Sequence, residues 1–192
     1  MAGGSGLELF EKYGAVRAGH FELRSGLHSD RYFQCALLMQ RPQVMEEICG
    51  RLAEAVMERI VPEDRPQLVV SPAIGGIILG YELARIMGCR AVFLEKEGGR
   101  LVLRRAFEIR EGERVLVAED VITRGGRVRQ TIAQVTARCA RVVAVAVLVD
   151  RRGGDVTLDY PLVSVVRAVP KVWDAAQCPL CERGIPLEHP GS

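Results

Sequence analysis

The sequence predicts an α/β protein built around a parallel β-sheet, and three observations support that class. From residue 67 onward, apolar strand patterns alternate with amphipathic helix patterns, as in βαβ units. The strand segments are nearly continuous apolar runs, which is typical of strands buried on both faces. The segment 115–127 passes from such a strand through two acids and a Gly-Gly pair into a helix pattern. In open parallel sheets this arrangement lies at the carboxyl edge, where ligands bind.

The composition is that of one globular domain. The chain has 192 residues, 48% of them hydrophobic, and a net charge of +2, which is enough length for one core. The balanced charge argues against nucleic acid as a partner. No apolar run reaches the roughly 20 residues of a membrane span, so a membrane is not expected either. The N-terminus shows no signal-peptide pattern, so we expect a cytoplasmic protein whose six cysteines are thiols.

The first part of the chain predicts a short helix over 7–13 and two strands over 15–24 and 30–36. Pro42 suits the first turn of the next helix. The apolar stripe of that helix consists of Val44, Ile48, Leu52, Ala55 and Val56.

The remainder alternates strands and helices. A largely buried helix over 76–87 ends at Gly88, which suits a left-handed cap. Gly98 and Gly99 predict a hairpin turn. A further helix follows Gly126, with one face formed by Val128, Ile132, Val135 and Cys139. The expected strands are 67–71, 90–95, 100–104, 114–118, 141–149 and 162–167.

The loop after strand 114–118 combines residue types with distinct chemical uses. Glu119 and Asp120 suit the hydroxyls of a sugar, or a hydrated Mg²⁺ that bridges to a diphosphate. Gly125 and Gly126 let the backbone turn and approach a ligand, and the helix start presents N–H groups to a phosphate. The loop therefore predicts a ligand with both a polyol and a phosphate. The alternative is an ordinary βα turn with two solvated acids. The signatures of the other common phosphate-binding turns, a Walker A lysine and GxGxxG, are both absent.

This segment resembles the loop that binds phosphoribosyl diphosphate (PRPP) in type I phosphoribosyltransferases. The resemblance implies that family's fold, a central parallel sheet flanked by helices, in one domain over 1–192. A small hood would come from about 1–40 and 168–192, and the core from about 41–167. In the family the two acids hold the ribose hydroxyls and the next residues wrap the 5′-phosphate. The implied PRPP contacts are Glu119, Asp120, Val121, Ile122, Thr123, Arg124, Gly125, Gly126 and Arg127.

A second stretch, 21–33, resembles the N-terminal signature of orotate phosphoribosyltransferases. It has Phe-x-Leu, a basic residue, Ser-Gly, then Ser and a Tyr-Phe pair. The resemblance implies that Arg24 reaches PRPP and that Tyr32 and Phe33 line the orotate site. Taken alone, the stretch also fits a polar surface turn.

Two more loops follow predicted strands. The first, 71–76, matches the family's diphosphate loop, and the implied PRPP contacts are Ala73, Ile74 and Gly75; a tight βα turn is the alternative. After strand 141–149, an arginine can clamp a carboxylate with two parallel hydrogen bonds. The resemblance implies that Arg151 contacts orotate together with Thr123, whereas an exposed basic turn is the alternative.

The segment 95–105 departs from the family pattern. Many members have a long mobile loop here, rich in lysine and histidine, whereas this chain has a compact hairpin without histidine. Lys96 matches one basic family position and is an expected PRPP contact. The other candidates to stabilise the negative charge of the leaving diphosphate are Arg100, Arg104 and Arg105. The alternative for Arg104 and Arg105 is a solvated strand end.

Cys178 and Cys181 form a single CxxC motif that looks like half of a zinc site. A tetrahedral zinc site needs four ligands, so the others would come from another chain, from His189 or from other residues. The alternative is a reduced cysteine turn. The tail around the motif resembles that of shorter, loop-reduced orotate phosphoribosyltransferases.

The resemblance as a whole implies transfer of the phosphoribosyl group from PRPP to orotate, in pyrimidine biosynthesis. It also implies Mg²⁺ bound through PRPP, with no direct protein ligand, and a homodimer. The expected catalytic residues are Asp120, Lys96 and Arg105. Two alternatives stay open: a phosphoribosyltransferase for another base, and a non-catalytic PRPP-sensing regulator, which the short 95–105 segment favours.

Overall fold

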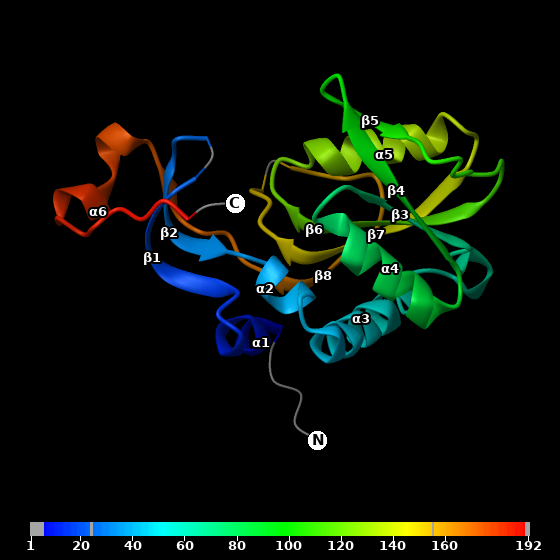
Figure 1. The fold of residues 1–192 in the computed structure, drawn as a ribbon, viewed down its shortest axis with the longest axis horizontal. Coiled ribbons are helices and arrows are strands. Elements are labelled where there is room, and N and C mark those ends of the chain that lie inside the picture. Colours follow the sequence, from blue (N-terminus) through cyan, green and yellow to red (C-terminus); the bar gives the residue numbers. More distant parts are fainter. Residues whose placement is uncertain (1–5, 24, 155, 191–192) are drawn as a thin grey trace.

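A computed structural model describes residues 6–23, 25–154 and 156–190, which form two β-sheets and their covering helices (Figure 1). The larger sheet has six strands in the order β5-β4-β3-β6-β7-β8, and the smaller has three in the order β1-β2-β9. Within the described ranges, no helix has the length and hydrophobicity that a membrane span requires.

The strands are β1 (Val16–Glu22), β2 (His28–Phe33), β3 (Leu68–Pro72), β4 (Arg90–Glu97), β5 (Arg100–Leu103), β6 (Arg114–Ile122), β7 (Arg141–Asp150), β8 (Leu162–Arg167) and β9 (Val172–Trp173). The helices are α1 (Gly6–Lys12), α2 (Ala36–Met39), α3 (Pro42–Met57), α4 (Gly76–Met87), α5 (Gly126–Thr136) and α6 (Pro179–Glu182), with 3-10 turns η1 (Pro62–Asp64) and η2 (Ala175–Gln177).

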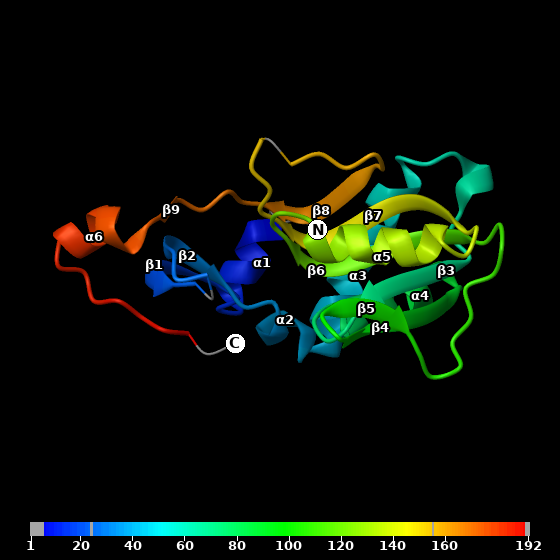
Figure 2. The same ribbon diagram turned by 90° about the horizontal axis from the view of Figure 1, so that it is seen from above.

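The larger sheet is parallel except for β5, which pairs antiparallel with β4. Helices α3 and α4 cover one face and α5 covers the other (Figure 1). Seen from above in Figure 2, α5 lies in front of the sheet. Successive residues of β3 alternate between these layers: Val69 packs toward α3 and α4, while Leu68 and Val70 pack toward α5. The apolar strand runs follow from this, because both faces of the sheet are buried.

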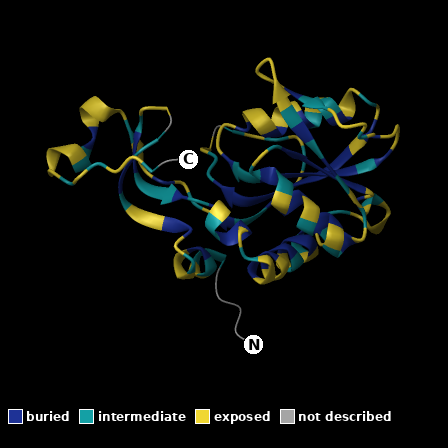
Figure 3. Ribbon diagram, in the orientation of Figure 1, coloured by how far each residue is buried: buried dark blue, intermediate teal, exposed yellow. Residues whose placement is uncertain are grey.

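The smaller sheet is the β1–β2 hairpin extended by β9 from the C-terminal part of the chain. In Figure 1 it lies to the left of the larger sheet, with α6 beyond it. Burial is concentrated in the larger sheet, whereas the segments around α6 are mostly exposed (Figure 3). The smaller sheet therefore has little apolar core of its own.

Several expected element boundaries are wrong. The second strand, expected over 30–36, is β2 over 28–33, and Ala36 already belongs to α2. The strands expected over 90–95 and 114–118 continue to Glu97 and Ile122. Cys139 is exposed and not on the apolar face of α5, because that helix ends at Thr136.

Helix α4 matches its expected range of 76–87, and Gly88 caps it with φ 68°. Its burial is one-sided, however: Leu79 and Leu83 are buried, whereas Ile78 and Tyr81 are exposed. The expected largely buried helix is therefore a half-exposed one.

Candidate active site at the carboxyl edge of the sheet

The predicted site loops meet where β3, β6 and β7 end. These strands are parallel neighbours, so the loops after Pro72, Ile122 and Asp150 leave the same edge of the sheet. The arrowheads of β6 and β7 in Figure 1 point toward the smaller sheet. The backbone N–H of Arg151 donates to the carbonyl of Ile122 at 2.9 Å and so links two of the loops.

Asp120 and the loop over 73–75 are in direct contact. A Cβ atom added to Gly75 would lie 2.3 Å from Oδ2 of Asp120, which is closer than real Cβ atoms approach. The carboxylate of Asp120 accepts a hydrogen bond from the N–H of Val121 at 2.8 Å. The glycine therefore allows the carboxylate to sit against the loop that is expected to hold diphosphate, in which the Ala73–Ile74 peptide is cis.

Glu119 is buried under Arg127. Its side chain is 1% exposed, and Arg127 Nε lies 3.2 Å from Glu119 Oε2. That contact has the distance of an ion pair but lacks hydrogen-bond alignment, so Oε2 has no hydrogen-bond partner within the described residues. Burial raises the pKa of Glu119 to about 9, hydrogen bonding and repulsion from Asp120 add to the rise, and Arg127 opposes it. Burial outweighs the arginine because the Arg127 side chain is itself 51% exposed.

Arg127 also donates a hydrogen bond to the carbonyl of Ala73. It thereby bridges the two loops that are expected to hold the sugar phosphate and the diphosphate. Gly125 has φ 76° and precedes α5, whose first turn follows directly. Thr123 and Arg124 are exposed beside it, so this loop presents a hydroxyl, a guanidinium and helix-terminal N–H groups on an accessible surface.

The two arginines after β7 have different partners. Arg152 clamps Asp150 with Nε to Oδ1 at 2.9 Å and Nη2 to Oδ2 at 3.0 Å. Burial pushes the pKa of Asp150 up, but the hydrogen bonds from Arg152 outweigh it and the pKa is lowered. Arg151 has no such clamp, and its buried Nε has no hydrogen-bond partner among the residues that the structure describes.

Arg151 lies against the smaller sheet. Its guanidinium carbon is 5.7 Å from the centre of the Phe33 ring. Burial lowers the pKa of Arg151, and nearby Cys35 and Tyr32 oppose this shift. Tyr32 stacks on Phe21, with ring centres 5.8 Å apart. The structure therefore brings together Phe33 and Arg151, which are far apart in the sequence and are both expected at the orotate site.

Cys35 also belongs to this neighbourhood, although the sequence analysis did not single it out. Its thiol is buried beside β2, and burial, reinforced by Asp120, raises its pKa far above the usual range. Arg151 acts in the opposite direction. Cys35 is thus near enough to Asp120 and Arg151 to be influenced by their charges, and only its position two residues after Phe33 could have indicated this.

The hairpin of β4 and β5 carries the remaining basic candidates. Arg105 contacts Glu95 at 2.6 Å, and Arg104 contacts Glu97 at 3.2 Å. Lys96 is exposed and makes no ion pair with any residue that the structure describes. The structure thus leaves Lys96 available while engaging Arg104 and Arg105 locally.

The remaining predicted residues are Arg24, Cys178 and Cys181. Arg24 falls outside the described residues. Cys178 and Cys181 lie beside the smaller sheet, and the expected partner His189 is not with them, because its Nδ1 contacts Glu22 at 2.7 Å. The two cysteines instead meet His20 and His28.

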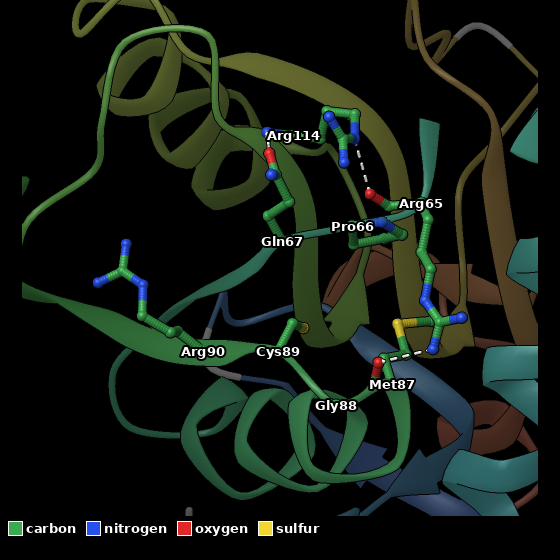
Figure 4. Close-up of a pocket in the computed structure, with 8 residues that line it drawn as sticks. All are labelled: Arg65, Pro66, Gln67, Met87, Gly88, Cys89, Arg90 and Arg114. Carbon is green, nitrogen blue, oxygen red and sulfur yellow. Dashed lines mark hydrogen bonds between the residues drawn. The ribbon is translucent and has the colours of Figure 1, made fainter. Parts of the chain in front are cut away.

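A pocket at the opposite edge of the larger sheet does not belong to this site. Figure 4 shows it at the start of β4 and β6, where Arg65 donates to the carbonyl of Met87. Its lining consists of Arg65, Pro66, Gln67, Met87, Gly88, Cys89, Arg90 and Arg114. Ligands of open α/β sheets bind at the carboxyl ends of strands, so this pocket at the amino ends is not a substrate candidate.

Known proteins are similar to this chain in sequence and in fold. The family description "Phosphoribosyl transferase domain" matches residues 40–182. The orotate phosphoribosyltransferase of Caldicellulosiruptor bescii is 45% identical over 186 residues, which cover 97% of this chain and 95% of that protein. The corresponding protein of Thermoanaerobacter sp. strain X514 is 46% identical over the same shares of the two chains.

Solved structures agree with these relatives. The orotate phosphoribosyltransferase from Aeropyrum pernix has a TM-score of 0.68 and 25% identity, covering 83% of this chain and 92% of that chain. An adenine phosphoribosyltransferase from Thermoanaerobacter pseudethanolicus, with a TM-score of 0.62, 19% identity and coverage of 72% of this chain and 88% of its own, shares the fold alone. With the family description over most of its length and relatives aligned nearly end to end, this chain belongs to the phosphoribosyltransferase family, among the orotate phosphoribosyltransferases.

Proposed function

We propose that this protein transfers the phosphoribosyl group of PRPP to orotate, giving orotidine 5′-monophosphate and diphosphate in pyrimidine biosynthesis. The observation that carries the proposal is the convergence of Asp120, Gly75 and Arg151 at one sheet edge. Orotate is a planar ring with a carboxylate. The Phe33 face and the unclamped Arg151 guanidinium match those two features.

The residues divide into a sugar-phosphate end and a base end. Asp120 accepts hydrogen bonds from the ribose hydroxyls. The loop of Thr123, Arg124 and Gly125 surrounds the 5′-phosphate, which the N–H groups at the start of α5 bind. Gly126 and Arg127 complete this end, while Val121 and Ile122 contribute backbone. Glu119 is buried beneath Arg127, so it contacts ribose only after Arg127 moves aside.

The chemistry needs charge stabilisation and no covalent nucleophile. The bond between ribose C1 and diphosphate breaks and positive charge develops at C1. A ring nitrogen of orotate forms the new bond to C1 and gives up its proton to the leaving diphosphate or to water. Asp120 stabilises that positive charge, and the backbone of Ala73, Ile74 and Gly75 faces the diphosphate. Lys96 supplies positive charge to the leaving group, joined by Arg105 once it separates from Glu95.

Mg²⁺ fits this site as a cation carried by the substrate. Among the described residues, the only cluster of three or more metal-binding side chains is His20, His28, Cys178 and Cys181. The carboxyl edge offers the partly exposed carboxylate of Asp120, and most ligands would be diphosphate oxygens and water, as Mg²⁺ prefers. Bound there, the cation would neutralise charge on the diphosphate.

A homodimer is supported by the exposed side of α4. Ile74, Ile78 and Tyr81 are 84%, 48% and 66% exposed and follow helical spacing. An apolar stripe next to the diphosphate loop suits association with a second copy. The cytoplasm is supported by the six cysteines, none of which forms a disulfide within the described residues, as expected in a reducing compartment.

The single domain over 1–192 is supported by the contact of Arg151 with Phe33, which joins the two sheets across the site. The strands of the smaller sheet lie within the segments assigned to the hood, about 1–40 and 168–192.

The experiment that tests the function follows the loss of orotate absorbance with PRPP and Mg²⁺. We expect loss only when PRPP is present, and no reaction with uracil, adenine, guanine or hypoxanthine. Asp120→Asn keeps the shape but removes the charge at C1, so we expect turnover to fall about 100-fold or more, the size of one lost electrostatic contact. Transfer to a purine in place of orotate would overturn the assignment of the base site.

A further inference from the structure

The smaller sheet holds a cluster of two histidines and two cysteines that the proposed reaction does not use. Nε2 of His20, Nδ1 of His28 and Sγ of Cys178 and Cys181 all lie within 4.8 Å of one another. Cys178 Sγ is 3.4 Å from His20 Nε2, and Cys181 Sγ is 3.3 Å from His28 Nδ1. Three of the four side chains are buried, and Cys181 is exposed.

These spacings suit one tetrahedral metal ion. Zinc bonds of about 2.3 Å to sulfur and 2.0–2.1 Å to nitrogen place neighbouring ligand atoms roughly 3.3–3.8 Å apart. The two sulfur–nitrogen distances above lie in that range, as does the 3.7 Å from Cys181 Sγ to His20 Nε2. The two histidine nitrogens are closer, at 2.9 Å, so metal binding requires them to separate by about 0.4 Å.

The orientation of His20 is set from outside the cluster. Its Nδ1 lies 2.8 Å from the carbonyl of Ile185, and a carbonyl can only accept, so Nδ1 carries the proton. The lone pair of Nε2 then points into the cluster, which is how a backbone carbonyl prepares a histidine ligand. The same tautomer also permits a plain hydrogen bond from His28 Nδ1 to His20 Nε2, and the experiment below separates the two.

We propose that His20, His28, Cys178 and Cys181 bind one structural Zn²⁺. Two thiolates and two imidazoles form a donor set that selects zinc over Mg²⁺ and Ca²⁺, which prefer oxygen ligands. Four protein ligands leave no open position for a substrate, so the ion has a structural role.

The site would fasten the two ends of the described chain to each other. His20 lies on β1 and His28 begins β2, whereas both cysteines belong to the α6 segment. Besides the cluster, that segment is held by a short β2–β9 pairing and by hydrogen bonds such as Glu22 N–H to the Glu188 carbonyl at 2.9 Å. Small units with little core commonly depend on a metal. Because β2 also carries Phe33, zinc would hold one wall of the orotate site.

The first test measures metal by mass spectrometry in protein purified without an affinity tag or chelator. We expect one zinc per chain. Cys178→Ser is expected to lose most of it, whereas Cys89→Ser, which removes a thiol at the opposite edge of the larger sheet, is expected to keep it. Zinc-free protein with freely titrating thiols would overturn the proposal, and so would zinc that survives Cys178→Ser.

Cobalt substitution tests the ligand set even if the serine variant fails to fold. Bound Co²⁺ is expected to show the visible bands of a tetrahedral site and a near-ultraviolet thiolate band. His28→Cys keeps four ligands, so we expect it to retain the metal with a stronger thiolate band. An unchanged thiolate band, or an octahedral cobalt spectrum, would count against the site. Neither readout depends on turnover, so the outcome is independent of the proposed reaction.

Discussion

At the scale of single residues, the two adjacent arginines after β7 differ in their hydrogen-bond partners. Arg152 forms a two-pronged clamp on Asp150. That clamp shapes the loop and leaves the neighbouring Arg151 facing the Phe33 ring with a buried, unpartnered Nε. An unpaired buried donor is costly unless a ligand satisfies it, which supports the proposal that Arg151 binds the carboxylate of orotate.

Replacing Arg151 with Gln is therefore expected to weaken orotate binding while leaving PRPP binding intact. A hydrogen bond to a charged group contributes about 1.5–3 kcal/mol, so the KM for orotate should rise about 10- to 100-fold. Steady-state kinetics with each substrate varied would measure this. Arg141→Gln, at the other end of the same strand, is the control. An equal rise in the KM of both substrates would contradict the assignment.

Glu119 is expected to make the stability of the ligand-free protein depend on pH. Its folded pKa is raised from 4.5 to about 9, so between these values the folded state holds a proton that the unfolded state releases. The free energy of unfolding therefore falls as pH rises through that window. Gln does not titrate, so Glu119→Gln removes this pH dependence, and the variant should gain stability over the original protein by up to about 1.4 kcal/mol per pH unit.

Urea denaturation of both proteins between about pH 5.5 and 8.5 would measure this difference. We expect the curves of stability against pH to diverge as pH rises, with the variant above the original protein. Curves that stay parallel would mean that Glu119 is ionised in the fold and that Arg127 outweighs burial.

At the scale of elements, the contact between β6 and the loop before α4 decides the shape of the site. Strand β6 runs on to Ile122, so Asp120 is held by strand pairing and not by a free loop. Gly75 then presents only backbone to its carboxylate. In the proposed site, a paired strand on one side and a glycine on the other would limit where the sugar and the diphosphate can lie.

Gly75→Ala is expected to displace the Asp120 carboxylate, because the new Cβ would lie 2.3 Å from Oδ2. Misplacement of a contact by about 1 Å can cost roughly 100-fold in rate, so kcat/KM for PRPP should fall by 10- to 100-fold with the melting temperature little changed. Gly50→Ala, whose Cβ would meet nothing within 4 Å, is the matched control and should keep full activity. A fully active Gly75→Ala protein would remove the diphosphate loop from the site.

At the scale of the whole molecule, the proposed site lies between the smaller and the larger sheet, and a second copy is expected on the outer face of α4. The apolar stripe of Ile74, Ile78 and Tyr81 begins in the diphosphate loop itself. Association through this face would therefore order the loop as well as bury the stripe.

Tyr81→Asp is expected to convert a dimer into a monomer, because a charge buried in an apolar contact is destabilising. Light scattering during size-exclusion chromatography would report the mass. Val61→Asp, at an apolar side chain that is 57% exposed elsewhere, should leave the dimer intact. A monomer in the original protein, or a dimer unaffected by Tyr81→Asp, would exclude this face.

The sequence by itself determined the class of fold, the order of the elements and the position of most site loops. Helix α4 was expected over 76–87 and lies there, because helical periodicity and a glycine cap are properties of neighbouring residues. The strand, two acids and Gly-Gly pair likewise predicted the turn between β6 and α5, since turn chemistry is local. Strand ends were less well predicted: β6 continues four residues further because β7 offers pairing partners.

Only the tertiary structure decided which side chains meet. Arg127 lies over Glu119, Arg152 forms an ion pair with Asp150, and Cys35 is within electrostatic reach of Asp120 and Arg151. The four-residue cluster of the hood is the clearest case, since His20 and Cys178 are 158 positions apart and yet 3.4 Å from each other. Such contacts depend on how the hairpin and the tail pack together, and no pattern within either segment encodes that distance.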